Sequence, residues 1–356
     1  MSPAPSITPL PYRTDDAERI FGSDARQRLL AAYEWMLLGR TLDGRMTALQ
    51  RQGRVGFYGA TTGHEALNAA VGLLTRPEDW IFPGLREQLV ALVRGHPLST
   101  YVQHLFATDL DPARGRQMPC HPSAREVGYV SMSSVIGTQI SQAVGFSEAL
   151  RRRRAPGVVL AFFGDGATSS NDFHAGMNWA GVRGLPLLFC CANNQWAISI
   201  PVDRQTAAPS MASKARAYGF EGEGVDGTDL FGLWEALGRS LDRVRRGEGP
   251  HLLEFELFRM TPHSSSDDPS RYQPTGWMER AYARDPLLRV QEWLERVGWL
   301  DPHQKKAMET RIETSIRQAV EVAEATPPPS PPSLFEDVYA QPLSLPADLG
   351  SGDPTE

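Results

Sequence analysis

The chain has 356 residues, of which 36 are Lys or Arg and 42 are Asp or Glu, so its formal charge at pH 7 is −6. Without a basic surplus, we expect no nucleic-acid partner. With 41% hydrophobic and 22% charged residues, the composition is that of a globular protein rather than a disordered one. The longest apolar stretches, such as Val158–Phe163 and Leu185–Ala192, are far shorter than the roughly 20 residues of a membrane span, so we expect a soluble protein with no membrane partner.

The cysteines and the N-terminus indicate the compartment. Cys120, Cys190 and Cys191 form neither a CxxC metal pair nor an even disulfide framework, which favours a reducing compartment. The first residues lack a basic start followed by an apolar core, and three acidic residues between positions 15 and 18 argue against an Arg-rich transit peptide. We therefore expect a cytoplasmic protein.

The first half of the chain is expected to be mainly helical. Residues 1–23 are proline-rich with little apolar periodicity, which predicts an extended arm. From Asp24, apolar residues recur at spacings of three and four, which predicts a helix. The same period appears at 64–74, 87–106 and 139–150, separated by turns at 75–84 and 108–128.

The centre of the chain shows the pattern of a parallel sheet. Two apolar runs, Gly157–Phe163 and Pro186–Ala192, are separated by one helical stretch, as in a β-α-β unit with strands buried on both faces. Gly222–Val225 and His251–Phe258 repeat the strand pattern around a helix at Leu230–Arg246. We predict an α/β fold with a doubly wound, mainly parallel sheet, helices on both faces, and ligands at the carboxyl ends of the strands.

The C-terminal part is expected to extend this domain. A polar, charged helix at Pro302–Ala325 is followed by a proline run at 327–332, which forms a stiff spacer. The predicted boundaries are thus an arm at 1–23, an α/β domain at 24–326 with helical extensions, and a Pro-rich tail at 327–356. Leu334–Tyr339 is again apolar and is a candidate docking segment.

Two short motifs at neighbouring strand ends predict a metal and phosphate site. Gly164-Asp165-Gly166 follows one buried strand, and Asn193-Asn194 ends the next. A glycine turn before a helix lets backbone amides approach a phosphate, and carboxylate and amide oxygens suit Mg²⁺, which takes few protein ligands plus phosphate oxygens. Each motif alone is also an ordinary turn sequence, but the pair at adjacent strand ends favours function.

These residues resemble a known family. The spacing of GDG and NN is that of the thiamine diphosphate motif, and five ordered blocks are similar to the α subunit of the branched-chain 2-oxo acid dehydrogenase decarboxylase component. The blocks are GRQMPCH (115–121), SSVIGTQISQAVG (133–145), FFGDGATSSNDFHAG (162–176), NNQWAIS (193–199) and HSSSDD (263–268).

The resemblance implies a thiamine diphosphate-binding fold, Mg²⁺, and oxidative decarboxylation of a 2-oxo acid with acyl transfer to lipoyl groups. It also implies two partners. A β subunit would complete an α2β2 heterotetramer and contribute the carboxylate that bonds the aminopyrimidine ring, and a lipoyl-bearing dihydrolipoyl acyltransferase would receive the acyl group.

The resemblance also implies roles for individual residues. Asp165 and Asn194 match side-chain ligands of Mg²⁺, and Trp196 falls where the family offers a backbone carbonyl. His263 is the candidate catalytic residue, because a histidine of near-neutral pKa at a strand end can move protons; the alternative is a polar loop residue. The expected cofactor-binding residues are Arg86, Ser134, Ile136, Gly164, Asp165, Gly166, Ala167, Asn194, Arg259 and His263.

The chain departs from the family pattern at positions expected near the diphosphate. Leu85 and Ala192 replace a Tyr and an Arg that the family usually has, and Ser170-Asn171 replaces a common Glu-Gly. Two other interpretations therefore stay open: a pyruvate- or acetoin-type dehydrogenase α subunit, or a degenerate, non-catalytic α-type subunit. The side chain of the substrate and any modification of Ser264 also stay open.

Other clusters favour structure over chemistry. His64-Glu65 does not continue to the second His of HExxH, because position 68 is Asn68, so a zinc site is not expected. Arg151–Arg154 is expected to end a helix, where cations complement the helix dipole.

Overall fold

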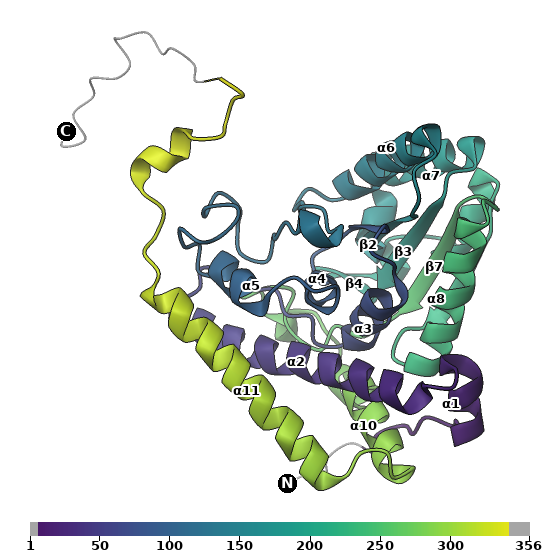
Figure 1. The fold of residues 1–356 in the computed structure, drawn as a ribbon. Coiled ribbons are helices and arrows are strands. Elements are labelled where there is room, and N and C mark those ends of the chain that lie inside the picture. The colour runs from purple at the N-terminus through teal and green to yellow at the C-terminus, as the bar shows by residue number, and fades with distance from the viewer. Residues whose placement is uncertain (1–5, 342–356) are drawn as a thin grey trace.

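A five-stranded parallel sheet organises the computed structural model, which describes residues 6–341 (Figure 1). The strand order is β1-β2-β3-β7-β6, and every pairing in this sheet is parallel. This confirms the predicted doubly wound α/β fold. The strands are β1 (Trp80–Phe82), β2 (Val159–Gly164), β3 (Leu187–Asn193), β6 (Gly222–Asp226) and β7 (His251–Glu256).

Alternate residues of the strands separate two cores, one on each face of the sheet. Leu160, Phe162 and Cys190 pack in the core that includes α3 (Glu65–Leu74) and α8 (Leu230–Arg245). Their neighbours in sequence pack in the core of α6 (Thr138–Arg153) and α7 (Asn171–Arg183). Burial of both faces explains why the two strands read as continuous apolar runs. Cys190 and Cys191 are both fully buried and unbridged, as expected for small apolar residues.

The N-terminal segment corrects the prediction of an extended arm over 1–23. Residues 14–21 form helix α1 (Thr14–Phe21), and Leu10, Ala17 and Phe21 have no exposed surface. The Phe21 ring contacts Phe231 and Trp234 of α8, at centroid distances of 5.1 and 4.8 Å. The apolar residues of α1 recur three and four apart, so the helix buries one face in the main core.

Two local predictions in the first half were also wrong. The expected helix over 87–106 is two helices, α4 (Gln88–Val93) and α5 (Leu98–Leu105), because Gly95 takes φ +104° and Pro97 precedes the second. The expected turn at 75–84 contains β1, whose three residues pair with β2. A strand this short has too few residues to show a period.

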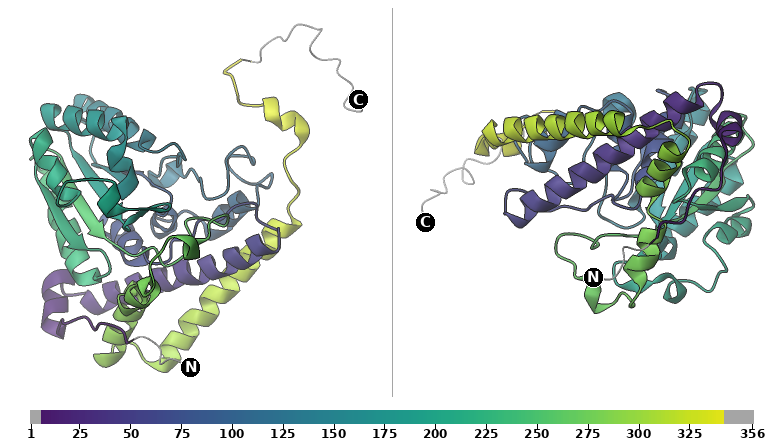
Figure 2. Two further views of the ribbon diagram at one scale, coloured as in Figure 1. Left: turned by 180° about the vertical axis from the view of Figure 1, so that it is seen from behind. Right: turned by 90° about the horizontal axis from the view of Figure 1, so that it is seen from below.

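A third core joins the ends of the chain. The long helix α2 (Ala25–Arg51) lies beside α11 (Pro302–Ala325), and both pack with α5 (Figure 2). Helices α9 (Trp277–Ala283) and α10 (Pro286–Arg296) connect the sheet to α11. Among residues 6–341, no helix combines the length and the apolarity that a bilayer crossing requires.

After α11 the chain leaves the body of the molecule, and the short helix η6 (Pro331–Phe335) stands apart from it (Figure 1). Phe335 is 80% exposed and Tyr339 61%. The segment is tethered by Arg114, which pairs with Glu336, and by Arg116. The part of the predicted 327–356 tail beyond residue 341 lies outside the described residues.

The packing of α1 predicts that Phe21→Ala lowers the free energy of unfolding by about 3–5 kcal/mol, because it leaves a cavity in the main core. Chemical denaturation would measure it. The matched control is Arg19→Ala, which removes an exposed ion pair to Glu235 and is expected to cost less than about 1 kcal/mol. Similarly small effects of the two changes would show that α1 is not part of the core.

Candidate active site

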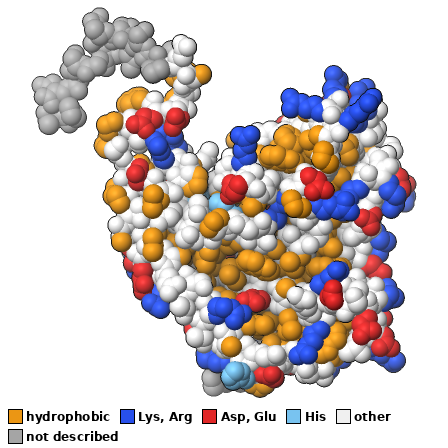
Figure 3. All heavy atoms as spheres, in the orientation of Figure 1, with side chains coloured by type: hydrophobic (Ala, Val, Ile, Leu, Met, Phe, Trp, Pro, Cys, Tyr) orange, Lys and Arg blue, Asp and Glu red, His pale blue; other side chains and the backbone are white. Residues whose placement is uncertain are grey.

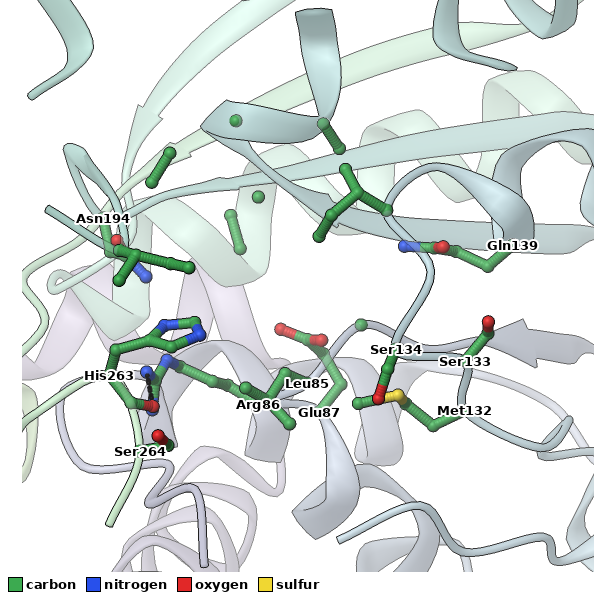
Figure 4. A pocket seen from close by; sticks show the side chains of 18 of the residues that line it. Leu85, Arg86, Glu87, Met132, Ser133, Ser134, Gln139, Asn194, His263 and Ser264 are labelled. Atoms are coloured by element: carbon green, nitrogen blue, oxygen red, sulfur yellow. Dashed lines mark hydrogen bonds between the residues drawn. The ribbon is translucent and has the colours of Figure 1, made fainter. Parts of the chain in front are cut away.

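The loops at the carboxyl ends of β2, β3 and β7 surround a cavity of about 460 Å³ (Figure 4). Every residue predicted to bind cofactor or metal lines it except Arg259. The lining members of that set are Arg86, Ser134, Ile136, Gly164, Asp165, Gly166, Ala167, Asn194, Trp196 and His263. Residues from separate parts of the sequence thus meet in one place.

Asp165 and Asn194 lie at adjacent strand ends because β2 and β3 pair in parallel, with Gly164 opposite Ala192. Asp165 is 1% exposed, and its Oδ2 accepts a hydrogen bond of 2.6 Å from Nε2 of Gln205. Burial raises the pKa of the Asp165 carboxyl, and the Gln205 hydrogen bond partly offsets this. The carboxylate is therefore held in one orientation toward the cavity's polar end.

Two features fit Mg²⁺ and a phosphate at this end. The carboxylate of Asp165 and the amide of Asn194 offer the oxygen ligands that Mg²⁺ takes together with phosphate oxygens. Gly166 approaches the hairpin after β3 so closely that a Cβ would lie 2.6 Å from Cβ of Ala197. Only glycine allows this approach.

A buried arginine, Arg86, lines the same cavity as Asp165 and Asn194. The Arg86 guanidinium donates to the carbonyl oxygens of Ala60 and His263, the latter at 2.8 Å, and it is 5% exposed. Burial and the nearby Arg259 lower the pKa of Arg86 to about 10. Carbonyl partners do not neutralise a guanidinium, so the cavity favours an anionic ligand.

Arg259 lies behind the cavity rather than on its surface. It is fully buried and donates to Ile198 O at 2.8 Å and to the Tyr272 hydroxyl at 2.5 Å, with Asp267 at 3.9 Å. Its NH1 also lies 3.5 Å from Trp196 O. Arg259 therefore holds the hairpin of β4 (Trp196–Ala197) and β5 (Ile200–Pro201) and adds positive charge to the cavity without lining it.

His263 follows β7, and its ring faces the cavity beside Arg86 (Figure 4). Its main chain is fixed on both sides, since its N–H donates to Asp267 Oδ2 at 2.7 Å and its carbonyl accepts from Arg86. Burial, with Arg86 and Arg259, lowers its pKa to about 4. The expectation of a near-neutral pKa is therefore wrong for the protein without a ligand, because burial disfavours the protonated ring and two guanidiniums repel it.

Apolar side chains also line the cavity. Met132 lies on the side away from Asn194 and His263, whereas Leu85 lies next to Arg86 (Figure 4). Phe57, Met118 and Ile136 complete this apolar lining, and Ile136 is 65% exposed. Elsewhere, hydrophobic side chains also reach the surface across the face in Figure 3. An apolar lining beside charged groups suits a ligand with a polar head and a hydrophobic body.

Sequence reasoning missed three residues of this cavity. His121 was interpreted as loop structure, yet it lines the cavity and its Nε2 contacts the Ser134 hydroxyl. His64 and Glu87 were not assigned to it either; they are 1% and 2% exposed. Burial and Arg86 lower the pKa of His64, whereas burial raises that of Glu87 to about 7. Two of these residues could have been predicted from their positions in the sequence: His121 ends the GRQMPCH block, and Glu87 follows Arg86.

Comparison with known proteins decides the family. A model of the dehydrogenase E1 component family matches residues 33–332. The chain belongs to this family. Members of the E1 family generally use thiamine diphosphate, in agreement with the strand-end motif.

Similar E1 proteins come from plants, bacteria and animals. The chain is 37% identical over 315 residues to 2-oxoisovalerate dehydrogenase subunit alpha 2 of Arabidopsis thaliana, covering 88% of this chain and 66% of that protein. It is 36% identical over 317 residues to the alpha subunit of Bacillus subtilis, covering 88% and 96%. It is 35% identical over 325 residues to the human alpha subunit, covering 91% of this chain and 72% of that protein.

The raised pKa of Glu87 predicts a pH dependence of stability. The folded-state value of about 7 exceeds the usual 4.5, so this carboxyl costs stability as pH rises from 4.5 to 7. Glu87→Gln removes the titration. The unfolding free energies of the variant and of the wild type would be measured on the ligand-free chain. We expect the variant's free energy minus that of the wild type to be about 2–3 kcal/mol larger at pH 8 than at pH 5. A constant difference between the two proteins would contradict the burial argument.

Proposed function

We propose that this chain is the α subunit of a 2-oxoisovalerate dehydrogenase and that its cavity holds thiamine diphosphate and Mg²⁺. The observation that carries the proposal is the meeting of Asp165, Asn194 and the buried Arg86 in one cavity that also has an apolar lining. The names of the most similar relatives support the choice of a branched-chain 2-oxo acid over pyruvate. The apolar lining suits such a side chain.

The residues divide by task. Asp165, the side-chain oxygen of Asn194 and the carbonyl of Trp196 would hold Mg²⁺, and Arg86 with the amides of Gly166 and Ala167 would bind the diphosphate. Ser134 and Ile136 also line the cavity and would border the cofactor's rings. When bound, thiamine diphosphate supplies the carbanion chemistry that decarboxylates the 2-oxo acid and passes the acyl group to a lipoyl disulfide.

His263 would manage protons in this reaction. In the protein alone, burial together with Arg86 and Arg259 lowers the pKa of its imidazole to about 4. A bound diphosphate would offset the charge of the two guanidiniums and so raise the pKa of His263. An imidazole that titrates nearer neutrality would both accept and donate protons, as an opening lipoyl disulfide requires.

The chain also needs partners. Apart from Asp165, the one carboxylate lining the cavity within residues 6–341 is Glu87, which accepts backbone N–H groups of its own loop. A separate β subunit would contribute the carboxylate for the aminopyrimidine ring, in an α2β2 heterotetramer that acylates a lipoyl-bearing acyltransferase. A reducing, cytoplasmic location agrees with three free, buried cysteines.

A second candidate is a non-catalytic α-type subunit. It is favoured by Leu85 and Ala192, which line the cavity without the hydroxyl and guanidinium expected there. Each missing charge-assisted bond to phosphate is worth about 1.5–3 kcal/mol. The residues that remain, Arg86, Asp165 and Asn194, still form one site, so we prefer the enzyme.

The decisive experiment is reconstitution with a co-expressed β chain. We expect thiamine diphosphate- and Mg²⁺-dependent activity with a higher kcat/KM for 2-oxoisovalerate than for pyruvate or acetoin, and no turnover by the purified α chain. Asp165→Ala is the control that ties activity to this site, because it removes a metal ligand outside the core. No activity, with no cofactor binding by calorimetry, would favour the non-catalytic subunit; faster turnover of pyruvate would overturn the substrate.

His263→Ala tests the proton role separately from anchoring. The loop's contacts to Asp267 and Arg86 use the main chain of His263, so the variant keeps them. We expect thiamine diphosphate affinity within a few-fold of wild type but lipoyl acylation reduced by about 10²–10⁴. Decarboxylation with an artificial electron acceptor should fall less. Near-normal rates in both assays would make His263 a polar loop residue only.

A further inference from the structure

His64 and Glu87 line the cavity, and neither has been given a role in cofactor or metal binding so far. His64 immediately precedes α3 and is 1% exposed. Its Nδ1 is buried and has no hydrogen-bond partner among the described residues, and Glu87 Oε1 lies 4.0 Å from it. Its Nε2 lies 3.4 Å from Nδ2 of Asn194. The ring thus stands between a buried carboxyl and an expected metal ligand.

The groups around His64 and Asn194 determine which atoms of this contact carry a hydrogen. An amide nitrogen donates and never accepts, so Nε2 of His64 must be the acceptor toward Asn194. A neutral imidazole carries one N–H, which is then on Nδ1 and faces Glu87. On the other side of the Asn194 amide, the main-chain N–H of Trp196 needs an oxygen as its hydrogen-bond acceptor. Asn194 Oδ1 lies 3.4 Å from the main-chain N of Trp196. Both neighbours specify the same orientation of the amide.

We propose that His64 is a positioning residue that holds the Asn194 amide with its oxygen available to the metal. This inference rests on the proposed function, since the metal belongs to it. An asparagine amide turned by 180° has almost the same shape but offers N–H donors where a cation needs an oxygen. Partners behind a ligand commonly set its orientation in this way.

The geometry of amide side chains allows a sharp test. A glutamine amide reaches about as far as Nε2 of a histidine, whereas an asparagine amide reaches only as far as Nδ1. His64→Gln therefore retains an acceptor for Asn194, and His64→Asn does not. His251→Asn is the matched control, because His251 is 7% exposed, bonds Ser240 and lies at the other end of β7, outside the cavity lining.

The measurement is the Mg²⁺ dependence of thiamine diphosphate binding, by calorimetry on the full chain assembled with its β subunit. We expect His64→Asn to raise the apparent Kd for Mg²⁺ by about 10- to 100-fold, the range for losing a partner behind a metal ligand. His64→Gln and His251→Asn should stay within a few-fold of wild type. Circular dichroism and thermal unfolding would confirm that each variant is folded.

The outcomes separate this inference from the function it rests on. Equal losses in His64→Gln and His64→Asn would show that the ring acts by packing alone, and no loss in either would show that Asn194 needs no partner; both overturn the inference and leave the function standing. An unfolded His64→Asn beside a folded His64→Gln of weakened Mg²⁺ affinity also overturns it. A wild type without Mg²⁺-dependent binding would overturn the proposed function and this inference together.

Discussion

The burial of two like charges beside one cavity is the constraint on which the rest of this site depends. Arg86 and Arg259 are 5% and 0% exposed, and burial lowers the pKa of each. Carbonyl oxygens of the 60–63 and 196–198 loops and of His263 receive their hydrogen bonds, so these loops are ordered around the guanidiniums. Two buried guanidiniums beside a cavity make it favourable for an anion. Burial, together with the charge of these two arginines, also lowers the pKa of His64 and of His263.

The sequence predicted which residues meet in the cavity where their position at the end of a strand determines their location. Asp165 and Asn194 follow buried runs that read as strands, and parallel strands bring their carboxyl ends to one edge, so their meeting was foreseeable. Helix α1 was not foreseeable from the proline-rich start before it. The pKa of His263 was not either, because it depends on Arg86, which is 177 positions away in the chain.

Leu85 and Ala192 line the cavity with apolar side chains. Among the residues that the structure describes, Arg86 is the one arginine on the lining, with Arg259 behind it. Leu85 adds apolar surface beside Phe57 and packs against Gly59. If the cavity holds the proposed cofactor, the smaller number of donors to phosphate would place more of its affinity on the metal and on Asp165 and Asn194.

A site that depends on its metal ligands also depends on what orients them. Asp165 is held by Gln205, whose Nε2 also donates to Ile200 O at 3.0 Å and so ties the carboxylate to the β4–β5 hairpin. Within residues 6–341 the Asn194 side chain has no hydrogen bond as short, only contacts of 3.4 Å to the main-chain N of Trp196 and to His64. Of the two proposed side-chain ligands, the asparagine is therefore the one whose orientation is less firmly fixed, and the buried side chains of His64 and Glu87 lie behind it.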